Sequence, residues 1–176
     1  MQLWRHHLGV SGVWYPLALK VGGRTVFLLW VSDDWALNRV LASVGQVAWF
    51  TDEDSARQYA LTQHLALAQK EEPHLHDLDR AARWLQADDE ADGRLLLAIW
   101  NLAGDVARSV GEAFEDRGGA LDDVYDKLFL GSNLPSMTPP GEPYQPDWTE
   151  EELSLLRGRI ETAVDLIRSH VAAPGS

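Results

Sequence analysis

The chain has no cysteine among its 176 residues. Disulfides, thiolate nucleophiles and cysteine-ligated zinc or iron–sulfur centres are therefore excluded, and the composition suits a reducing compartment. No apolar run approaches the ~18 residues that a membrane-spanning helix needs. The first ten residues are not followed by the apolar segment and small-residue cleavage site of a secretory signal. We therefore predict a cytoplasmic protein that does not bind membranes.

Motifs of the common enzyme classes are also missing. The sequence has no G-x-x-x-x-G-K-[ST] phosphate loop, no G-x-G-x-x-G after a strand, no G-x-S-x-G elbow, no H-E-x-x-H and no calcium loop. Each absence removes the usual form of one class of enzyme. We therefore assign no catalytic residue and no cofactor, and we favour a non-enzymatic role.

Basic residues are few, and they are unevenly distributed. Residues 1–50 hold four basic and two acidic residues, a net charge of +2, whereas residues 51–176 hold 11 basic and 25 acidic residues, a net charge of −14. A negative field of this size repels nucleic acid and favours either solubility or a basic protein partner. We therefore expect no nucleic-acid binding.

Strand signals are concentrated in residues 1–50. Val13 to Val31 is rich in strand formers on both sides of Gly22-Gly23, a two-residue turn that predicts a β-hairpin. Val47 to Phe50 predicts a further short strand. Because helical patterns follow the strands rather than alternate with them, the sequence indicates an α+β fold with a small, mainly antiparallel sheet.

About five helices are predicted in residues 51–176. They follow the spacing of apolar residues and the N-cap signals at Thr51, Asp77 and Thr149. The segment Gly93 to Phe114 is apolar over so much of its circumference that we expect it to be central. The expected ranges are residues 52–69, 77–85, 93–114, 121–129 and 149–171. We treat residues 1–176 as a single domain.

A proline-rich segment, residues 131–147, interrupts the helical part. Its five prolines exclude helix and disfavour strand, so we interpret it as an ordered strap across the fold. Leu134, Met137 and Tyr144 are the side chains that we expect to anchor it to the core.

Two features suggest partner-binding residues. Acidic residues at helix starts have a structural reason to be there, but the run Asp88, Asp89, Glu90 and Asp92 exceeds what capping requires. The chain is also rich in tryptophan, with eight residues, and Trp35 follows two aspartates in an irregular stretch. Most of the tryptophans fit core positions. We regard the acidic run and Trp35 as candidates for contact with a partner, although a solvated linker also explains the run.

The best candidate for a metal site is His74 and His76 with Asp77. An H-x-H pair places both imidazoles on one face of a strand, and a nearby carboxylate can complete a ligand set. Here the pair follows a proline and precedes a helix start, so an extended ladder is not assured. We interpret Asp77 as a helix cap and His74 as a solvated loop residue, and we predict no metal site.

Two functional hypotheses follow. The first is an acidic protein-interaction module that binds or masks a basic partner, such as an immunity or antitoxin-like inhibitor of a nuclease. The alternative is a small-ligand or metal-dependent enzyme with a pocket between the sheet and the helices.

Overall fold

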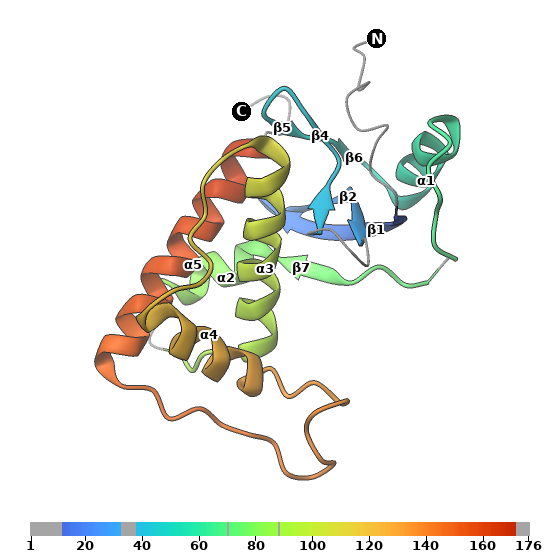
Figure 1. The fold of residues 1–176 in the computed structure, drawn as a ribbon. Coiled ribbons are helices and arrows are strands. Elements are labelled where there is room, and N and C mark those ends of the chain that lie inside the picture. The colour runs from blue at the N-terminus through green and yellow to red at the C-terminus, as the bar shows by residue number, and fades with distance from the viewer. Residues whose placement is uncertain (1–11, 33–37, 70, 88, 172–176) are drawn as a thin grey trace.

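The computed structural model describes residues 12–32, 38–69, 71–87 and 89–171. Most strands precede the helices, so the fold is α+β as predicted (Figure 1). The strands are β1 Val13–Val21, β2 Arg24–Ser32, β3 Arg39–Val40, β4 Ala42–Ser43, β5 Gln46–Val47, β6 Trp49–Phe50 and β7 Leu75–Asp77. The helices are α1 Glu53–Thr62, α2 Leu78–Trp84, α3 Gly93–Val110, α4 Ala120–Gly131 and α5 Glu150–His170.

The β1–β2 hairpin forms at the predicted turn. The two strands are antiparallel in continuous register, and Gly22 and Gly23 have φ values of 60° and 77°. This left-handed backbone is the conformation that a type I′ turn requires and that glycine adopts without strain. Both glycine N–H groups donate to the carboxylate of Asp79, at 2.9 and 2.8 Å. The turn is therefore fastened to α2.

The main sheet is mainly antiparallel, as predicted, but it is mixed because one of its pairings is parallel. Its strand order is β3-β2-β1-β7, with β6 also paired to β2, and β7 runs parallel to β1. The reason is the path of the chain after α1. Trp14 N donates to Ala66 O at 2.7 Å and Ala68 N donates to Trp14 O at 2.9 Å, so the chain runs beside the start of β1 and continues in the same direction to β7.

Pro16 lies inside β1 without disturbing it. It stands opposite Leu29 in unbroken register with β2. On its other side, the N–H groups of Trp14 and Ala18 donate outward, to Ala66 O and His74 O. No described strand pairs with β1 between these two contacts. The N–H that proline lacks would therefore face a gap in the ladder, so its absence costs no strand hydrogen bond.

The sheet is buried on both faces. Val26 and Leu28 pack into the main core with α2, α3 and α5, whereas Leu29 and Val31 pack into a second core with α1. A strand with a single buried face would alternate apolar and polar residues. Burial on both faces explains why β2 reads as a nearly continuous apolar run.

Helix α3 is central, as predicted. It packs against α4, α5 and the sheet, and it crosses α4 at very close range. A Cβ atom added to Gly93 would lie 2.5 Å from the carbonyl oxygen of Gly131. The helix ends four residues earlier than Phe114, because Gly111 adopts a left-handed conformation at φ 78°.

Helix α1 is shorter than predicted. It ends at Thr62 rather than near Gln69. Its N-cap is Asp52 rather than the predicted Thr51, because the Asp52 carboxylate accepts Ser55 N at 2.7 Å. The end is set by His64, which is left-handed at φ 56°, and by a bond from Leu65 N to Ala60 O. Pairing of the following residues with β1 competes with the helical continuation that their spacing suggested.

The remaining helix starts agree with the sequence. Asp77 caps α2 by accepting Arg80 N, and Thr149 and Glu152 form the predicted capping box of α5. In the part of the chain that the structure describes, no helix is both long and apolar enough to cross a membrane.

Candidate partner-binding surface

Acidic residues dominate the segment from α4 to the first turn of α5. Residues 120–152 hold eight acidic residues and one basic residue, a net charge of −7 out of −12 for the chain. The acidic residues are Asp122, Asp123, Asp126, Glu142, Asp147, Glu150, Glu151 and Glu152. The strap, residues 131–147, connects α4 to α5 and loops out beyond α4 (Figure 1).

The acidic run before α3 lies at the same end of the helices. Arg94 Nε donates to Ser132 O at 3.0 Å, which joins the start of α3 to the start of the strap. Arg157 in α5 donates to Ala87 O at 3.1 Å, and Trp84 Nε1 donates to Asp89 O at 3.1 Å. Residues 85–87 and 89–92, α4, the strap and the start of α5 therefore lie at one end of the molecule (Figure 1). We call this region the acidic end.

Positive charges compensate the acidic end in part, because Arg94 and Arg157 also lie there and donate to backbone carbonyl oxygens. Lys127 Nζ pairs with Glu152 at 2.7 Å and donates to Asp147 O at 2.9 Å. The hydrogen bond between Lys127 and Glu152 lowers the pKa of Glu152 and raises the pKa of Lys127. Arg117 pairs with the α4 carboxylates, at 3.0 Å to Asp126. Among the described residues, the acids without an ion-pair partner include Asp123, Glu142, Glu150 and Glu151.

The predicted acidic run divides into two parts. Asp92 has a structural role, because its carboxylate caps α3 by accepting Leu95 N at 3.1 Å and pairs with Arg80 at 2.9 Å. Asp89 and Glu90 are exposed side chains within the acidic end. The other two candidates, Asp88 and Trp35, lie outside the described residues.

Sequence reasoning missed the acids of the strap and assigned those of α5 to capping alone. Glu150 and Glu151 do stand in the first turn of α5, where the helix dipole favours them. That α5 and the segment before α3 belong to the same end of the molecule depends on the contacts between α2 and α5. The uneven charge of residues 120–152 was nevertheless visible in the sequence.

His74, His76 and Asp77 are not arranged as a metal site. His74 is exposed, and His76 is half-buried in β7, where burial lowers its pKa. Asp77 caps α2 and lies 3.6 Å from Lys20 Nζ. Across the described residues, no group of three or more metal-ligating side chains is close enough to hold an ion.

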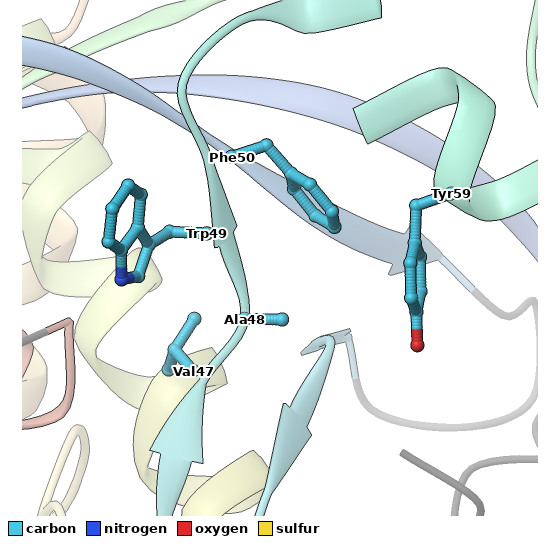
Figure 2. A pocket seen from close by; sticks show the side chains of 5 residues that line it. All are labelled: Val47, Ala48, Trp49, Phe50 and Tyr59. Carbon is cyan, nitrogen blue, oxygen red and sulfur yellow. The ribbon is translucent and has the colours of Figure 1, made fainter. Parts of the chain in front are cut away.

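A shallow apolar pocket of about 190 Å³ lies between β6 and α1. Ala48 and Phe50 point toward Tyr59, while Val47 and Trp49 point to the other side of the strand (Figure 2). The pocket is smaller than the roughly 300–1,000 Å³ of typical small-ligand sites. Its single ionisable side chain is Tyr59, whose pKa is raised by burial. This arrangement supplies no acid–base pair or nucleophile to support the enzymatic alternative.

Asp105 is a buried charge with a full set of partners. It accepts Trp30 Nε1 at 2.8 Å and pairs closely with Arg108, which also faces Asp116 at 3.6 Å. Burial raises the pKa of Asp105, while the bonds from Trp30 and Arg108 oppose the rise. Since every partner belongs to the packed junction of β2 and α3, Asp105 has a structural role.

Comparison with known proteins leaves the family open. A scan against protein-family models gives no match, and a search of curated proteins gives none either. Among solved structures, the chain resembles the C-terminal domain of SatS, crystallised in complex with bromine, at 17% sequence identity and a TM-score of 0.46. The alignment covers 90% of this chain and 92% of that one. A likeness this distant carries no conclusion about function.

Proposed function

We propose that the chain is a protein-interaction module whose acidic end binds a basic protein partner. One observation supports this function above the others: residues 120–152 carry a net charge of −7, and their single basic residue is already paired with Glu152. Asp89 and Glu90 extend the same charge. Complementary charge of this kind raises the rate of encounter and excludes partners of the same sign.

The acids of this region offer more charge than folding requires. Capping explains Asp92 and Glu152, and ion pairing explains the α4 carboxylates that face Arg117. Asp123 stands in the first turn of α4, where the helix dipole favours it. Glu142 has none of these explanations, and it is exposed. Unpaired surface carboxylates repel one another, so a partner that neutralises them lowers the free energy of the complex.

The test compares two variants with the same total charge. Glu150→Gln/Glu151→Gln removes two charges from the acidic end, and Glu161→Gln/Asp165→Asn removes two exposed charges further along the same helix. Binding of a fluorescein-labelled hexa-arginine peptide is measured by anisotropy at 20 and 200 mM NaCl. We expect the first variant to lose severalfold in affinity and the second less than twofold, with binding that weakens steeply with salt.

Equal losses in the two variants would contradict the proposal, because they would show that only the net charge of the chain matters.

A nuclease is one class of partner that fits this chemistry, because its nucleic-acid surface is basic. In that case the chain would mask the surface, as an immunity or antitoxin-like inhibitor does. The corresponding test is co-purification with the basic product of a neighbouring gene, together with inhibition of its nuclease activity. Glu150→Gln/Glu151→Gln should weaken both, and inhibition that persists unchanged would argue against masking by the acidic end.

A further inference from the structure

A second apolar pocket lies within the acidic end. It has a volume of about 140 Å³ and is formed by the last turn of α4 and the strap. Its main lining residues are Phe129, Leu130, Leu134, Met137, Pro139 and Tyr144. Leu130, Met137 and Tyr144 are 46%, 58% and 40% exposed. The sequence predicted that Leu134, Met137 and Tyr144 anchor the strap to the core. Instead Met137 and Tyr144 are exposed around an open pocket, and Leu134 is half-buried in its lining.

The strap is held in place by backbone and amide hydrogen bonds rather than by those side chains. Asn133 Oδ1 accepts Tyr144 N at 2.7 Å, and Asn133 Nδ2 donates to Tyr144 O at 2.9 Å. Met137 N donates to Leu134 O at 2.9 Å. Pro146 packs directly on Gly131 at the end of α4. The pocket is thus formed before any partner arrives, which reduces the entropy lost on binding.

The size of the pocket selects its occupant. The volume of the pocket is about 140 Å³. It is below the roughly 300–1,000 Å³ of small-ligand sites, but it suits one apolar side chain of medium size. Single anchors of this kind, surrounded by polar contacts, are the usual centre of a protein interface.

The negative charge around the pocket favours basic residues next to that side chain in the partner. Glu142 is itself part of the lining, whereas Asp126, one turn before Leu130 in α4, is paired with Arg117. The surrounding segment has a net charge of −7. Lysine or arginine residues on either side of the anchor would therefore be attracted, whereas acidic ones would be repelled.

We infer that this pocket receives a single leucine-sized side chain from a basic segment of the partner protein. The inference rests on the proposed function of the acidic end, and it adds a requirement that charge alone does not impose: a medium-sized apolar residue between the basic ones.

Two peptides separate anchoring from charge. Each has nine residues, with three arginines on either side of a core that is glycine–leucine–glycine in one peptide and glycine–asparagine–glycine in the other. Met137 is one of only two methionines in the chain, so protein labelled with [methyl-¹³C]methionine reports directly on the pocket. The leucine peptide should shift the Met137 methyl resonance, which the Met137→Leu variant identifies, and should bind about tenfold tighter than the asparagine peptide.

A matched pair of variants completes the test. Leu130 and Leu155 are 46% and 39% exposed, so Leu130→Ser and Leu155→Ser remove similar exposed side chains, one inside the pocket and one on α5. Leu130→Ser should abolish the preference for the leucine peptide, and Leu155→Ser should leave it unchanged.

The outcomes distinguish the two proposals. If both peptides bind equally and respond to Glu150→Gln/Glu151→Gln but not to Leu130→Ser, the acidic end binds by charge alone and the anchoring pocket is ruled out. If neither peptide binds more tightly to the wild type than to Glu150→Gln/Glu151→Gln, the proposed function fails and the pocket fails with it.

Discussion

At the scale of single residues, burial lowers the pKa of His76 and raises the pKa of Asp105, so it disfavours the charged form of both. His76 in β7 has a pKa lowered from its usual 6.5 by burial, so the folded chain holds it neutral. Asp105 is nearly inaccessible, yet it is compensated by Trp30 and Arg108. The first group therefore makes folding depend on pH, and the second makes it depend on an intact set of partners.

The first residue-scale prediction concerns His76 and pH. As the pH falls through 6.5, the unfolded chain protonates this imidazole while the folded chain does not, so stability is lost until the pH passes the lower folded pKa. We expect the stability difference between wild type and His76→Gln to shrink as the pH falls from 7 to 5, measured by urea unfolding. His64→Asn is the control, because His64 is exposed and asparagine tolerates its left-handed backbone. A difference that is independent of pH would contradict the prediction.

The second concerns the two carboxylates that face Arg108. The side chain of Asp105 is 8% exposed, whereas that of Asp116 is 44% exposed and lies 3.6 Å from Arg108. Asp105→Ala leaves the Trp30 N–H and the guanidinium without their buried partner, so we expect a loss of about 3 kcal/mol in the free energy of unfolding. Asp116→Ala should cost less than about 1 kcal/mol. Chemical denaturation measures both, and similar losses would show that Asp105 is not the buried centre of this junction.

At the scale of elements, packing distance decides what each helix tolerates. Helices α3 and α4 approach so closely at Gly93 that a Cβ would meet the backbone of Gly131 at 2.5 Å. Gly158 in α5 has no atom within 4 Å of the same added Cβ. Gly93 is the first residue of α3, and Gly158 lies in the interior of α5, where alanine is intrinsically favoured.

The element-scale prediction uses this pair. Gly93→Ala should destabilise the protein by about 1–3 kcal/mol, because backbone cannot move aside as a flexible side chain can. Gly158→Ala should stabilise it by up to about 1 kcal/mol through helix propensity. Thermal unfolding followed by circular dichroism distinguishes the two signs. Stabilisation by both substitutions would mean that α3 and α4 are farther apart than described.

At the scale of the whole molecule, one sheet joins two cores. Strand β2 contributes Leu28 to the core beneath α3 and α5, and Leu29 to the core beneath α1. Because both cores pack on the same strand, loss of either one would expose a face of β2 and weaken the strand on which the other core depends. This arrangement favours the single domain that the sequence predicts for residues 1–176, which stays a prediction.

The whole-molecule prediction is a single unfolding transition. Urea curves from far-ultraviolet circular dichroism, which follows the helices, and from tryptophan fluorescence should coincide. Leu29→Ala in the second core and Ile99→Ala in the main core should each shift both curves together, by about 2–5 kcal/mol. If Leu29→Ala shifts only one curve, α1 and its core form a separate unit.

The sequence alone determined the local structure wherever a short pattern acts by itself. The glycine pair at the β1–β2 turn, the capping box at Thr149 and the apolar circumference of α3 each depend on neighbouring residues only, and the structure agrees with all three. The uneven charge that motivates the partner hypothesis is likewise a property of composition.

Only the tertiary structure decided the features that depend on residues far apart in the chain. The early end of α1 and the parallel pairing of β7 follow from pairing with β1, which helical spacing cannot reveal. The same holds at the acidic end: Asp92 proved to be a cap paired with Arg80, while bonds made by Trp84 and Arg157 fix the segment that carries exposed Asp89 to α5. Local patterns specify backbone conformation and charge, but proximity across 60 residues is set by packing.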